Sequence, residues 1–541
     1  MKTLLSLILL STAVPAAAIP IEQLKTDTKV LASDAFEGRE PGSPGETKTI
    51  DYLVKRMTEM GLKPGNNGQW TQDVPTVSIT TAPTPLQIAG GKAPMTLAYG
   101  PDQVVWTKRQ TAEQALVNSP IVFIGYGINA PDRGWNDYEG VDVRGKTVVM
   151  LVNDADWWAP TSGKDAGPFN GKEQTYYGRY ILKFEEAVRQ GAAAAIIIHQ
   201  EVPAAWPYSV VTSTWTGPQV DLDSPDKGMG RLAVEGWLSL DAAKRLFASA
   251  GLDLLALEKA AGQRGFRAVE TGLTASTKLE NTIARSNSKN VVGIIPGAKR
   301  PDEVVLVTAH WDHIGRCTPD ASGDDICNGA LDDAIGTAGL LAIAADVMKG
   351  PRPERSIAFL AVTGEEAGLL GSEYYARNPV FPLAKTVGGV NMDVLNVFGK
   401  MDGFTIIGAG QSELEAIATR LATAQGRRIL PEDTPQNGFY FRSDHFSLAR
   451  RGVPMLFGRG GGEVIGKPPG FGLAAQANYV AKQYHTPSDE YSDDWDWAGA
   501  LQDLDMFRDF SLDLANRKDW PNWLPSSEFR AIRDASRKTA P

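Results

Sequence analysis

The carboxyl-terminal half of the chain alternates short apolar runs with amphipathic segments. Apolar, β-branched runs typical of buried strands occupy residues 290–295, 303–308, 356–362, 387–392 and 405–407. Apolar residues at helical spacing occupy residues 336–348 and 412–425. Strands that alternate with helices are typical of a sheet covered by helices on both faces. We therefore predict an α/β fold with a doubly wound, mostly parallel sheet. We assign residues 274–541 to the catalytic domain that contains this sheet.

A further amphipathic segment lies near the amino terminus. Apolar residues recur at helical spacing from Ile50 to Met57, and Gly61 marks the end of the pattern. Residues 70–100 are rich in Thr, Val and Pro, a composition that predicts short strands and turns. We assign residues 19–110 to the amino-terminal part of the same domain.

The middle of the chain has its own set of apolar elements. Strands are predicted at 121–127, 146–152 and 192–198, with one helix at 180–191. This block contains no convincing cluster of nucleophile, base or metal ligand. We therefore predict an inserted, β-rich α/β domain over residues 111–273 that takes no part in chemistry. His199 follows the last of these strands and could be a ligand, but a single histidine at a strand end is more often structural.

Size and charge fit this division. A chain of 541 residues is longer than a single hydrophobic core usually supports, so two or three domains are expected. The net charge of −10 argues against nucleic acid as a partner. Nothing in the sequence specifies an oligomeric state.

The first 18 residues have a cationic start, a short apolar core and a small-residue end. This pattern predicts a signal peptide cut after Ala18, and therefore a protein exported to the periplasm or secreted. No later apolar run approaches the length of a membrane span.

The two cysteines, Cys317 and Cys327, lie close together in a polar loop. In an oxidising compartment a disulfide is the favoured state of such a pair. Zinc binding by these two cysteines is disfavoured, because a zinc site needs further ligands and the spacing is not that of a zinc knuckle.

Potential metal ligands gather at the ends of the predicted strands, where open sheets bind their ligands. They are His310, Asp332, Glu365, Glu366, Asp393 and His485. Two imidazoles and three carboxylates suit two zinc ions, with one carboxylate shared between the ions. The remaining carboxylate of the pair Glu365 and Glu366 is then free to take a proton from water.

Each candidate also has an ordinary structural explanation. Asp332 could cap a helix, Asp393 could lie in a turn, and His485 could be a simple loop residue. Glu365 and Glu366 could form the solvated first turn of a helix. These explanations are adequate one by one, but a series of such residues at successive strand ends favours a metal site.

The arrangement resembles a known family, the co-catalytic zinc exopeptidases that include bacterial leucyl aminopeptidase and glutamate carboxypeptidase. The blocks that carry the resemblance are residues 309–313, 328–336, 363–372, 391–393, 443–446 and 484–489. Their order and spacing match over about residues 276–500. Residues 111–273 resemble the protease-associated domain that interrupts many members of this family, and residues 34–39 resemble its opening helix–loop segment.

The resemblance implies a role for each ligand. His310 and Asp393 would hold one zinc ion, Glu366 and His485 would hold a second, and Asp332 would bridge the two. His313 lies beside a ligand motif, but nothing in the resemblance makes it a ligand.

The resemblance also implies catalytic residues. Glu365 would be the general base, and Asp312 would orient the imidazole of His310. Tyr440 would donate to the oxyanion, although Tyr374 or Tyr484 could take that place.

The function implied is hydrolysis of peptide substrates by an exopeptidase with two zinc ions, with an aminopeptidase favoured. Arg442 and Arg459 keep a carboxypeptidase or dipeptidase open, because either side chain could bind a substrate carboxylate. A non-catalytic binding protein or a glutaminyl cyclase fits less well, since all five ligands and the base are present.

Overall fold

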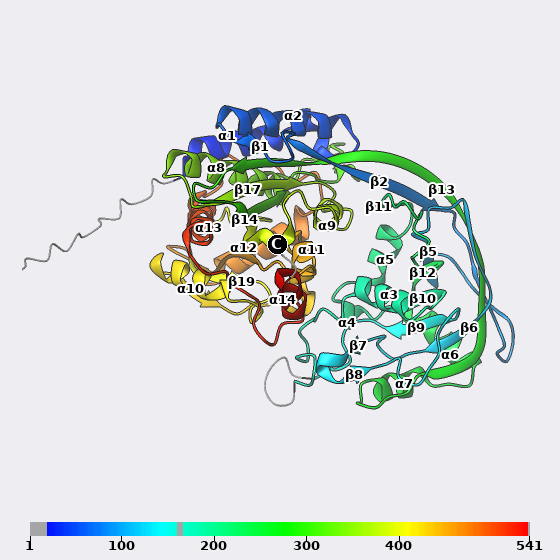
Figure 1. Cartoon of the computed structure of the whole chain (residues 1–541). Helices are drawn as coiled ribbons and strands as arrows, with labels where there is room; N and C mark the ends of the chain where they lie inside the picture. The colour runs from blue at the N-terminus through cyan, green and yellow to red at the C-terminus, as the bar shows by residue number, and fades with distance from the viewer. Residues whose placement is uncertain (1–18, 160–165, 539–541) are drawn as a thin grey trace, which may run out of the picture.

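The structure is a computed structural model and describes residues 19–159 and 166–538. The predicted signal peptide lies outside the described residues. The chain forms two bodies joined by two long, paired strands (Figure 1). We call residues 19–81 and 281–538 the first body and residues 82–280 the second body.

The sheet of the first body is parallel at its centre, with antiparallel pairs on either side and one parallel pair, β19–β20, at one edge. Its neighbouring strands, in spatial order, are β2 (Thr71–Thr81), β13 (Val269–Ile295), β17 (Arg355–Val362), β14 (Arg300–His310), β18 (Thr386–Asn391), β21 (Met455–Val464), β19 (Met401–Ile406) and β20 (Arg428–Leu430). β17, β14, β18 and β21 run parallel to one another. The prediction of an α/β fold with a mostly parallel sheet is confirmed.

Helices cover both faces of this sheet. The helices of the first body are α1 (Ile21–Leu31), α2 (Pro44–Glu59), α8 (Ile335–Lys349), α9 (Leu370–Arg377), α10 (Leu414–Ala424), α11 (His445–Ala449), α12 (Phe471–Lys482), α13 (Ala498–Asn516) and α14 (Arg530–Lys538). Successive side chains of a strand point to opposite faces. Val305 and Val307 of β14 accordingly share a core with α8 and α13, whereas Val304 and Leu306 share another with α9 and α11. None of the helices in the described part of the chain has the length and apolar character needed to cross a membrane.

The second body has its own sheet and its own cores. Its strands are β3 (Leu86–Ala89), β4 (Met95–Leu97), β5 (Gln103–Trp106), β6 (Glu113–Phe123), β9 (Thr147–Leu151), β10 (Ala194–Ile198) and β12 (Val234–Leu238). Its helices are α3 (Tyr180–Arg189), α4 (Glu201–Ala204), α5 (Tyr208–Thr214), α6 (Leu240–Ser249) and α7 (Leu254–Ala261). β6, β9, β10 and β12 are parallel neighbours, and apolar side chains pack on both faces of the sheet.

The connection between the bodies differs in detail from the predicted limits of the inserted block, 111–273. β3, β4 and β5 precede residue 111 and pair within the second sheet. β11 (Pro218–Leu222) falls inside the block but pairs with β2. β13 belongs to both sheets, because its first half pairs with β6 and its second half with β2.

Candidate metal centre

The register of the parallel strands brings the predicted ligands to one edge of the first sheet. His310 lies beside Val362 across the β14–β17 pair, and Thr308 lies beside Asn391 across the β14–β18 pair. The carboxyl ends of these three strands therefore coincide. Their following residues, which include Glu366 and Asp393, emerge at the same place.

Asp332 occupies the centre of the cluster. It lies in the turn Ala330–Ala334 before α8, and its peptide bond to Asp333 is cis. Its Oδ1 lies 3.3 Å from Nε2 of His310, and its Oδ2 lies 3.2 Å from Nε2 of His485. Each oxygen of one carboxylate thus faces a different imidazole, which is the arrangement required of a bridging ligand.

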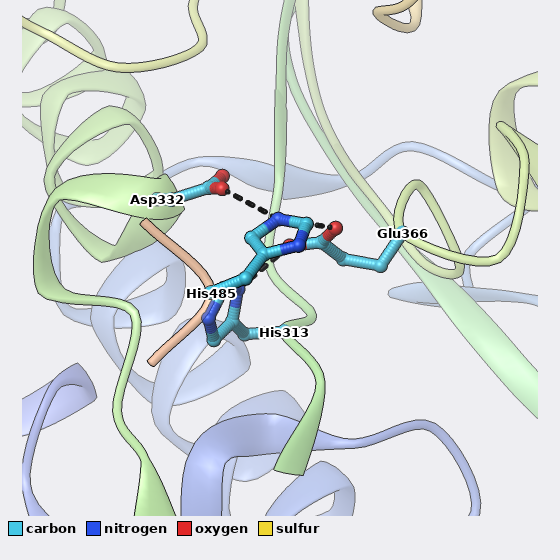
Figure 2. A group of neighbouring side chains, drawn as sticks. All are labelled: His313, Asp332, Glu366 and His485. Atoms are coloured by element: carbon cyan, nitrogen blue, oxygen red, sulfur yellow. Dashed lines mark hydrogen bonds and ion pairs between the residues drawn. The ribbon is translucent and has the colours of Figure 1, made fainter. Parts of the chain in front are cut away.

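The ligand atoms form two groups that share Asp332. One group is His310, Asp332 and Asp393, and the other is His313, Asp332, Glu366 and His485. Within each group the potential ligand atoms lie within 4.8 Å of one another. Figure 2 shows the second group, in which Oε2 of Glu366 lies 3.0 Å from Nε2 of His485. In the first group Oδ1 of Asp393 lies 3.8 Å from Nε2 of His310.

These groups fit zinc. Nε2 of His310 and Nε2 of His485 are buried and make no hydrogen bond within the described residues, although carboxylate oxygens surround them. Buried polar atoms are normally paired. Imidazole nitrogens and carboxylate oxygens are zinc ligands, so a cation among them would satisfy these atoms.

The electrostatics of the cluster favour positive charge. Burial would lower the pKa of His485, but Glu366 and Asp332 raise it to about 10. Burial and Asp332 would raise the pKa of Glu366, but His313 and His485 lower it to about 2. The carboxylate of Glu366 is therefore ionised and available to ligate a cation.

Glu365 stands apart from both groups. Its backbone N–H donates to Oδ1 of Asp312 at 3.3 Å. Burial raises the pKa of the Glu365 carboxyl well above its ordinary value, so this carboxylate takes up a proton readily. This property suits the role of general base predicted for it.

Asp312 contacts His310 and Glu365 through different atoms. Its backbone carbonyl oxygen lies 3.1 Å from Nδ1 of His310, and its carboxylate lies 3.8 Å away. The imidazole is thus oriented mainly by the carbonyl, whereas the carboxylate holds the backbone of Glu365. Burial raises the pKa of Asp312 to about 7.

The structure does not bring Tyr440 into the carboxylate–imidazole cluster. Its ring packs among aromatic side chains that include Phe446 and Phe529, and it lines a small cavity together with Glu432 and Glu528. Burial and the charge of Glu528 act on its hydroxyl, whereas none of the predicted ligands does.

Of the two alternatives, Tyr484 is the one beside the ligands. Its ring stacks on His485 with the ring centroids 3.8 Å apart. Burial and then Asp332 and Glu366 raise the pKa of its hydroxyl. Tyr374 packs instead against a separate apolar cluster.

A disulfide joins Cys317 to Cys327, with the Cα atoms 6.0 Å apart. The two cysteines lie at the ends of the loop between the short strands β15 (Gly315–Arg316) and β16 (Ile326–Cys327). The bond therefore closes the loop that leads to Asp332.

Two residues of the site were not assigned from the sequence. The ring of His313 lies inside the second ligand group, where Nδ1 is 2.6 Å from Oε1 of Glu366. The guanidinium of Arg39 lies against the same loops and, among the described residues, donates only to backbone carbonyls. The signal for His313 was its place in the ligand motif at residues 309–313, whereas nothing in the sequence indicated the partners of Arg39.

Comparisons with known proteins agree with this geometry. The family model described as Peptidase family M28 matches residues 290–507. A probable zinc metalloprotease from Leptosphaeria maculans is 35% identical over 121 residues, which cover 22% of this chain and 27% of that protein. Aminopeptidase NAALADL1 from Rattus norvegicus is 34% identical over 129 residues, which cover 23% of this chain and 16% of that protein. The chain thus spans well under half the length of these two relatives.

A solved structure, the aminopeptidase from Aneurinibacillus sp. strain AM-1, is similar with a TM-score of 0.48 and 16% identity, covering 93% of this chain and 95% of that chain. Residues 290–507 of this chain, which contain all five predicted ligands, are thus similar to peptidase family M28.

Proposed function

We propose that the protein is an exported zinc exopeptidase that releases amino-terminal residues from peptides. The observation that carries this proposal is the position of Asp332, whose two oxygens face His310 and His485. A carboxylate shared between two sets of N and O ligands is the arrangement that a pair of zinc ions requires.

The ligands divide into two sets. His310 and Asp393 would hold one zinc ion, Glu366 and His485 would hold the other, and Asp332 would contribute to both. When bound, zinc supplies Lewis acidity, which polarises a carbonyl and lowers the pKa of a water molecule from about 15.7 towards about 7.

The protein's own residues supply the proton transfers and the orientation. Glu365 would take a proton from the attacking water and pass it to the leaving amine. Asp312 would hold both Glu365 and His310 in place through the contacts described above. We assign the oxyanion role to Tyr484 in place of Tyr440, because its ring stacks on a ligand imidazole.

One observation supports an aminopeptidase, and another favours a carboxypeptidase. A curated relative is named an aminopeptidase. Against this, Arg442 and Arg459 both lie within 6 Å of the ring of Phe439, at 5.7 and 5.6 Å, and neither forms an ion pair within the described residues. The guanidinium of Arg459 donates to the side-chain oxygen of Gln476 at 2.8 and 3.2 Å, so Arg442 is the better placed of the two to bind a substrate carboxylate. A carboxypeptidase is therefore the second candidate.

Acetylation of the substrate separates the two candidates. The zinc-loaded protein should hydrolyse amino-acid p-nitroanilides that have a free amine and should fail on the acetylated compounds. Equal hydrolysis of acetylated substrates, or shortening of peptides from the carboxyl terminus, would contradict the aminopeptidase proposal.

Export is supported by two observations. The pattern of residues 1–18 is that of a signal peptide, and the disulfide between Cys317 and Cys327 is a bond that persists in oxidising compartments. Fractionation of producing cells should find the protein outside the cytoplasm with Ile19 as its first residue. A cytoplasmic protein with an intact amino terminus would contradict this part of the proposal.

We further propose that the second body, which resembles a protease-associated domain over residues 111–273, takes no direct part in the chemistry. His199, its candidate ligand, is buried among the rings of Trp206, Tyr208 and Trp237. Both ligand groups found in the described residues lie in the first body.

A further inference from the structure

We propose that His313 is a positioning residue that holds Glu366 so that only one of its two oxygens is offered to the metal. The inference rests on the proposed function, because it concerns how the chain prepares one of the proposed zinc ligands. His313 acts in it through Glu366 and is not itself a ligand.

The two oxygens of Glu366 have different partners. Oε1 lies 2.6 Å from Nδ1 of His313, which is a hydrogen-bond distance, and Oε2 lies 3.0 Å from Nε2 of His485 (Figure 2). Nε2 of His485 and Nε2 of His313 are both buried without a hydrogen bond among the described residues, whereas Nδ1 of His313 is held by Oε1 of Glu366. Oε2 of Glu366 therefore faces the proposed metal position together with His485, whereas Oε1 is occupied by the hydrogen bond to His313.

Packing fixes the ring of His313. The side chain is fully buried, and the backbone of Gly329 lies directly against the ring. Gly329 has φ 53°, and a Cβ added there would lie 2.5 Å from ring carbons of His313. Only glycine leaves space for the imidazole at this position.

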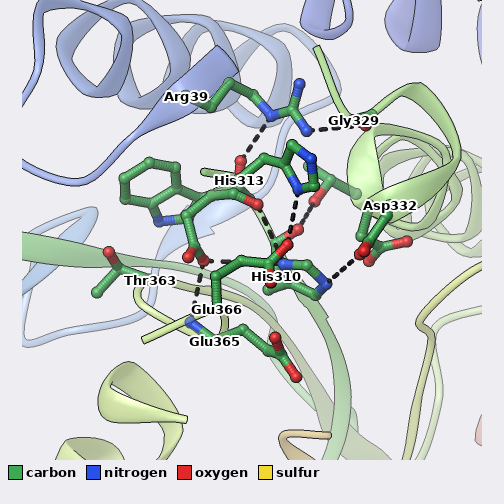
Figure 3. A network of polar contacts seen from close by, with 12 residues as sticks. Arg39, His310, His313, Gly329, Asp332, Thr363, Glu365 and Glu366 are labelled. Carbon is green, nitrogen blue, oxygen red and sulfur yellow. Dashed lines mark hydrogen bonds and ion pairs between the residues drawn. The ribbon is translucent and has the colours of Figure 1, made fainter. Parts of the chain in front are cut away.

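Arg39 fixes the loops on either side of that ring (Figure 3). Its guanidinium is 1% exposed and donates to the carbonyl oxygens of Leu31 at 2.9 Å, Trp311 at 2.8 Å and Gly329 at 2.9 Å, and also to that of Asn328. In return the N–H of His313 donates to the carbonyl oxygen of Arg39 at 3.4 Å. One buried cation thus connects the end of α1, the end of β14 and the loop before Asp332.

The hydrogen bond should determine the affinity of one metal site. A partner that orients a ligand in this way typically contributes about 10- to 100-fold to metal affinity. Loss of the Nδ1–H donor should free Glu366 to rotate, and the burial of Oε1 without a partner should disfavour the ligating conformation.

The test compares His313→Asn with His313→Leu in the full-length protein. The asparagine side-chain amide places an N–H donor near the position of Nδ1, whereas leucine supplies none. His199→Leu is the matched control, because it removes an equally buried histidine from the second body. Zinc affinity is measured on metal-free protein by competition with a chromophoric chelator, and the ligand set is followed by the visible spectrum of the cobalt-substituted protein.

We expect His313→Leu to weaken one of the two zinc sites by about 10- to 100-fold. His313→Asn should bind zinc nearly as tightly as the wild type, with an unchanged cobalt spectrum, and His199→Leu should match the wild type. Should His313→Leu fail to fold, His313→Gln replaces it, because its longer side chain carries the amide past the position of Nδ1.

Three results would overturn the inference. Wild-type affinity in His313→Leu, or in His313→Gln where it replaces that variant, would show that the hydrogen bond does not prepare Glu366. A cobalt spectrum altered equally in the Asn and Leu variants would show that His313 is a ligand. A wild-type protein that binds no zinc would overturn the proposed function as well, whereas the first two results would leave it intact.

Discussion

Two histidines occupy equivalent places in the two bodies, and their surroundings differ. His199 follows β10 and His310 ends β14, so each lies at the carboxyl end of a buried parallel strand, and each is at most 2% exposed. Burial among aromatic rings lowers the pKa of His199 to about 4. Burial would also lower the pKa of His310, but Asp332 and Asp393 raise it well above its ordinary value.

The comparison shows which surroundings turn a buried histidine at a strand end into a candidate metal ligand. Burial alone keeps a histidine neutral, whereas carboxylates that converge from neighbouring strands favour a positive charge among them. The second body also buries acids, but these have partners. Asp137 accepts from the N–H groups of Tyr126 and Ile128, and Asp154 accepts from Thr175.

Substitution at Glu365 should give the largest effect, because it removes catalysis from the first body without removing the metal ligands. Glu365→Gln removes the general base but leaves the ligands, so kcat should fall by about 10²- to 10⁴-fold while the zinc content stays at the wild-type value. Steady-state assays on a p-nitroanilide substrate, combined with metal analysis, measure both quantities. A fully active Glu365→Gln protein would exclude Glu365 as the base.

Substitution at Asp332 should act on the metal itself. Asp332→Asn weakens a ligand shared by both groups, so zinc affinity should fall by more than the roughly 10- to 100-fold expected for the loss of an orienting partner. Activity should be lost with the metal and should return only at high zinc concentration. Chelator titration of the variant beside the wild type measures this, and an unchanged affinity would remove Asp332 from the bridging position.

Removal of the disulfide should have a smaller effect, on stability. The bond closes a loop with a sequence separation of 10 residues, and such loops typically contribute about 2–3 kcal/mol. The Cys317→Ser/Cys327→Ser protein should therefore unfold at a lower temperature than the wild type and still bind zinc. Equal thermal unfolding of the two proteins would show that the loop does not depend on the bond.

His199 should affect only the pH dependence of stability. Its pKa is about 4 in the folded protein against an ordinary value of 6.5, so the unfolded chain takes up the proton first as the pH falls. Stability is then complete above pH 6.5 and is lost progressively towards pH 4, by about 2 kcal/mol at pH 5.

His199→Leu should remove that part of the loss between pH 7.5 and pH 5 and leave peptidase activity unchanged. Chemical denaturation of both proteins at the two pH values measures the difference. An activity loss in this variant would give the second body a role in the chemistry that we do not expect.

The sequence was informative where strands are wholly apolar. The runs at 303–308 and 356–362 fall within β14 and β17, and the residues that follow them are brought together by the parallel register. Only the last part of β13, residues 290–295, was predicted as a strand, and its preceding residues were not. Residues 281–291 pair with β2 as a ribbon with many exposed positions, so they lack the apolar signal of a buried strand.

The positions of His313 and Arg39 depend on contacts between distant parts of the chain. His313 lies in a loop, where the direction of a side chain is not set by strand or helix periodicity. Arg39 donates to the carbonyl of Trp311, 272 residues away in the sequence, and backbone carbonyls have no signature in the residue type. β3, β4 and β5 lie before the predicted start of the inserted block for a similar reason, because β3 and β5 pair with β13 and β12, which are far away in the sequence.

The most direct test of the central claim is the zinc content of the purified protein after equilibration with zinc and removal of excess metal. The account predicts two zinc ions per chain in the wild type, fewer in Asp332→Asn, and two in both Glu365→Gln and His199→Leu. A wild-type protein that retains no zinc and shows no peptidase activity when zinc is added would contradict it.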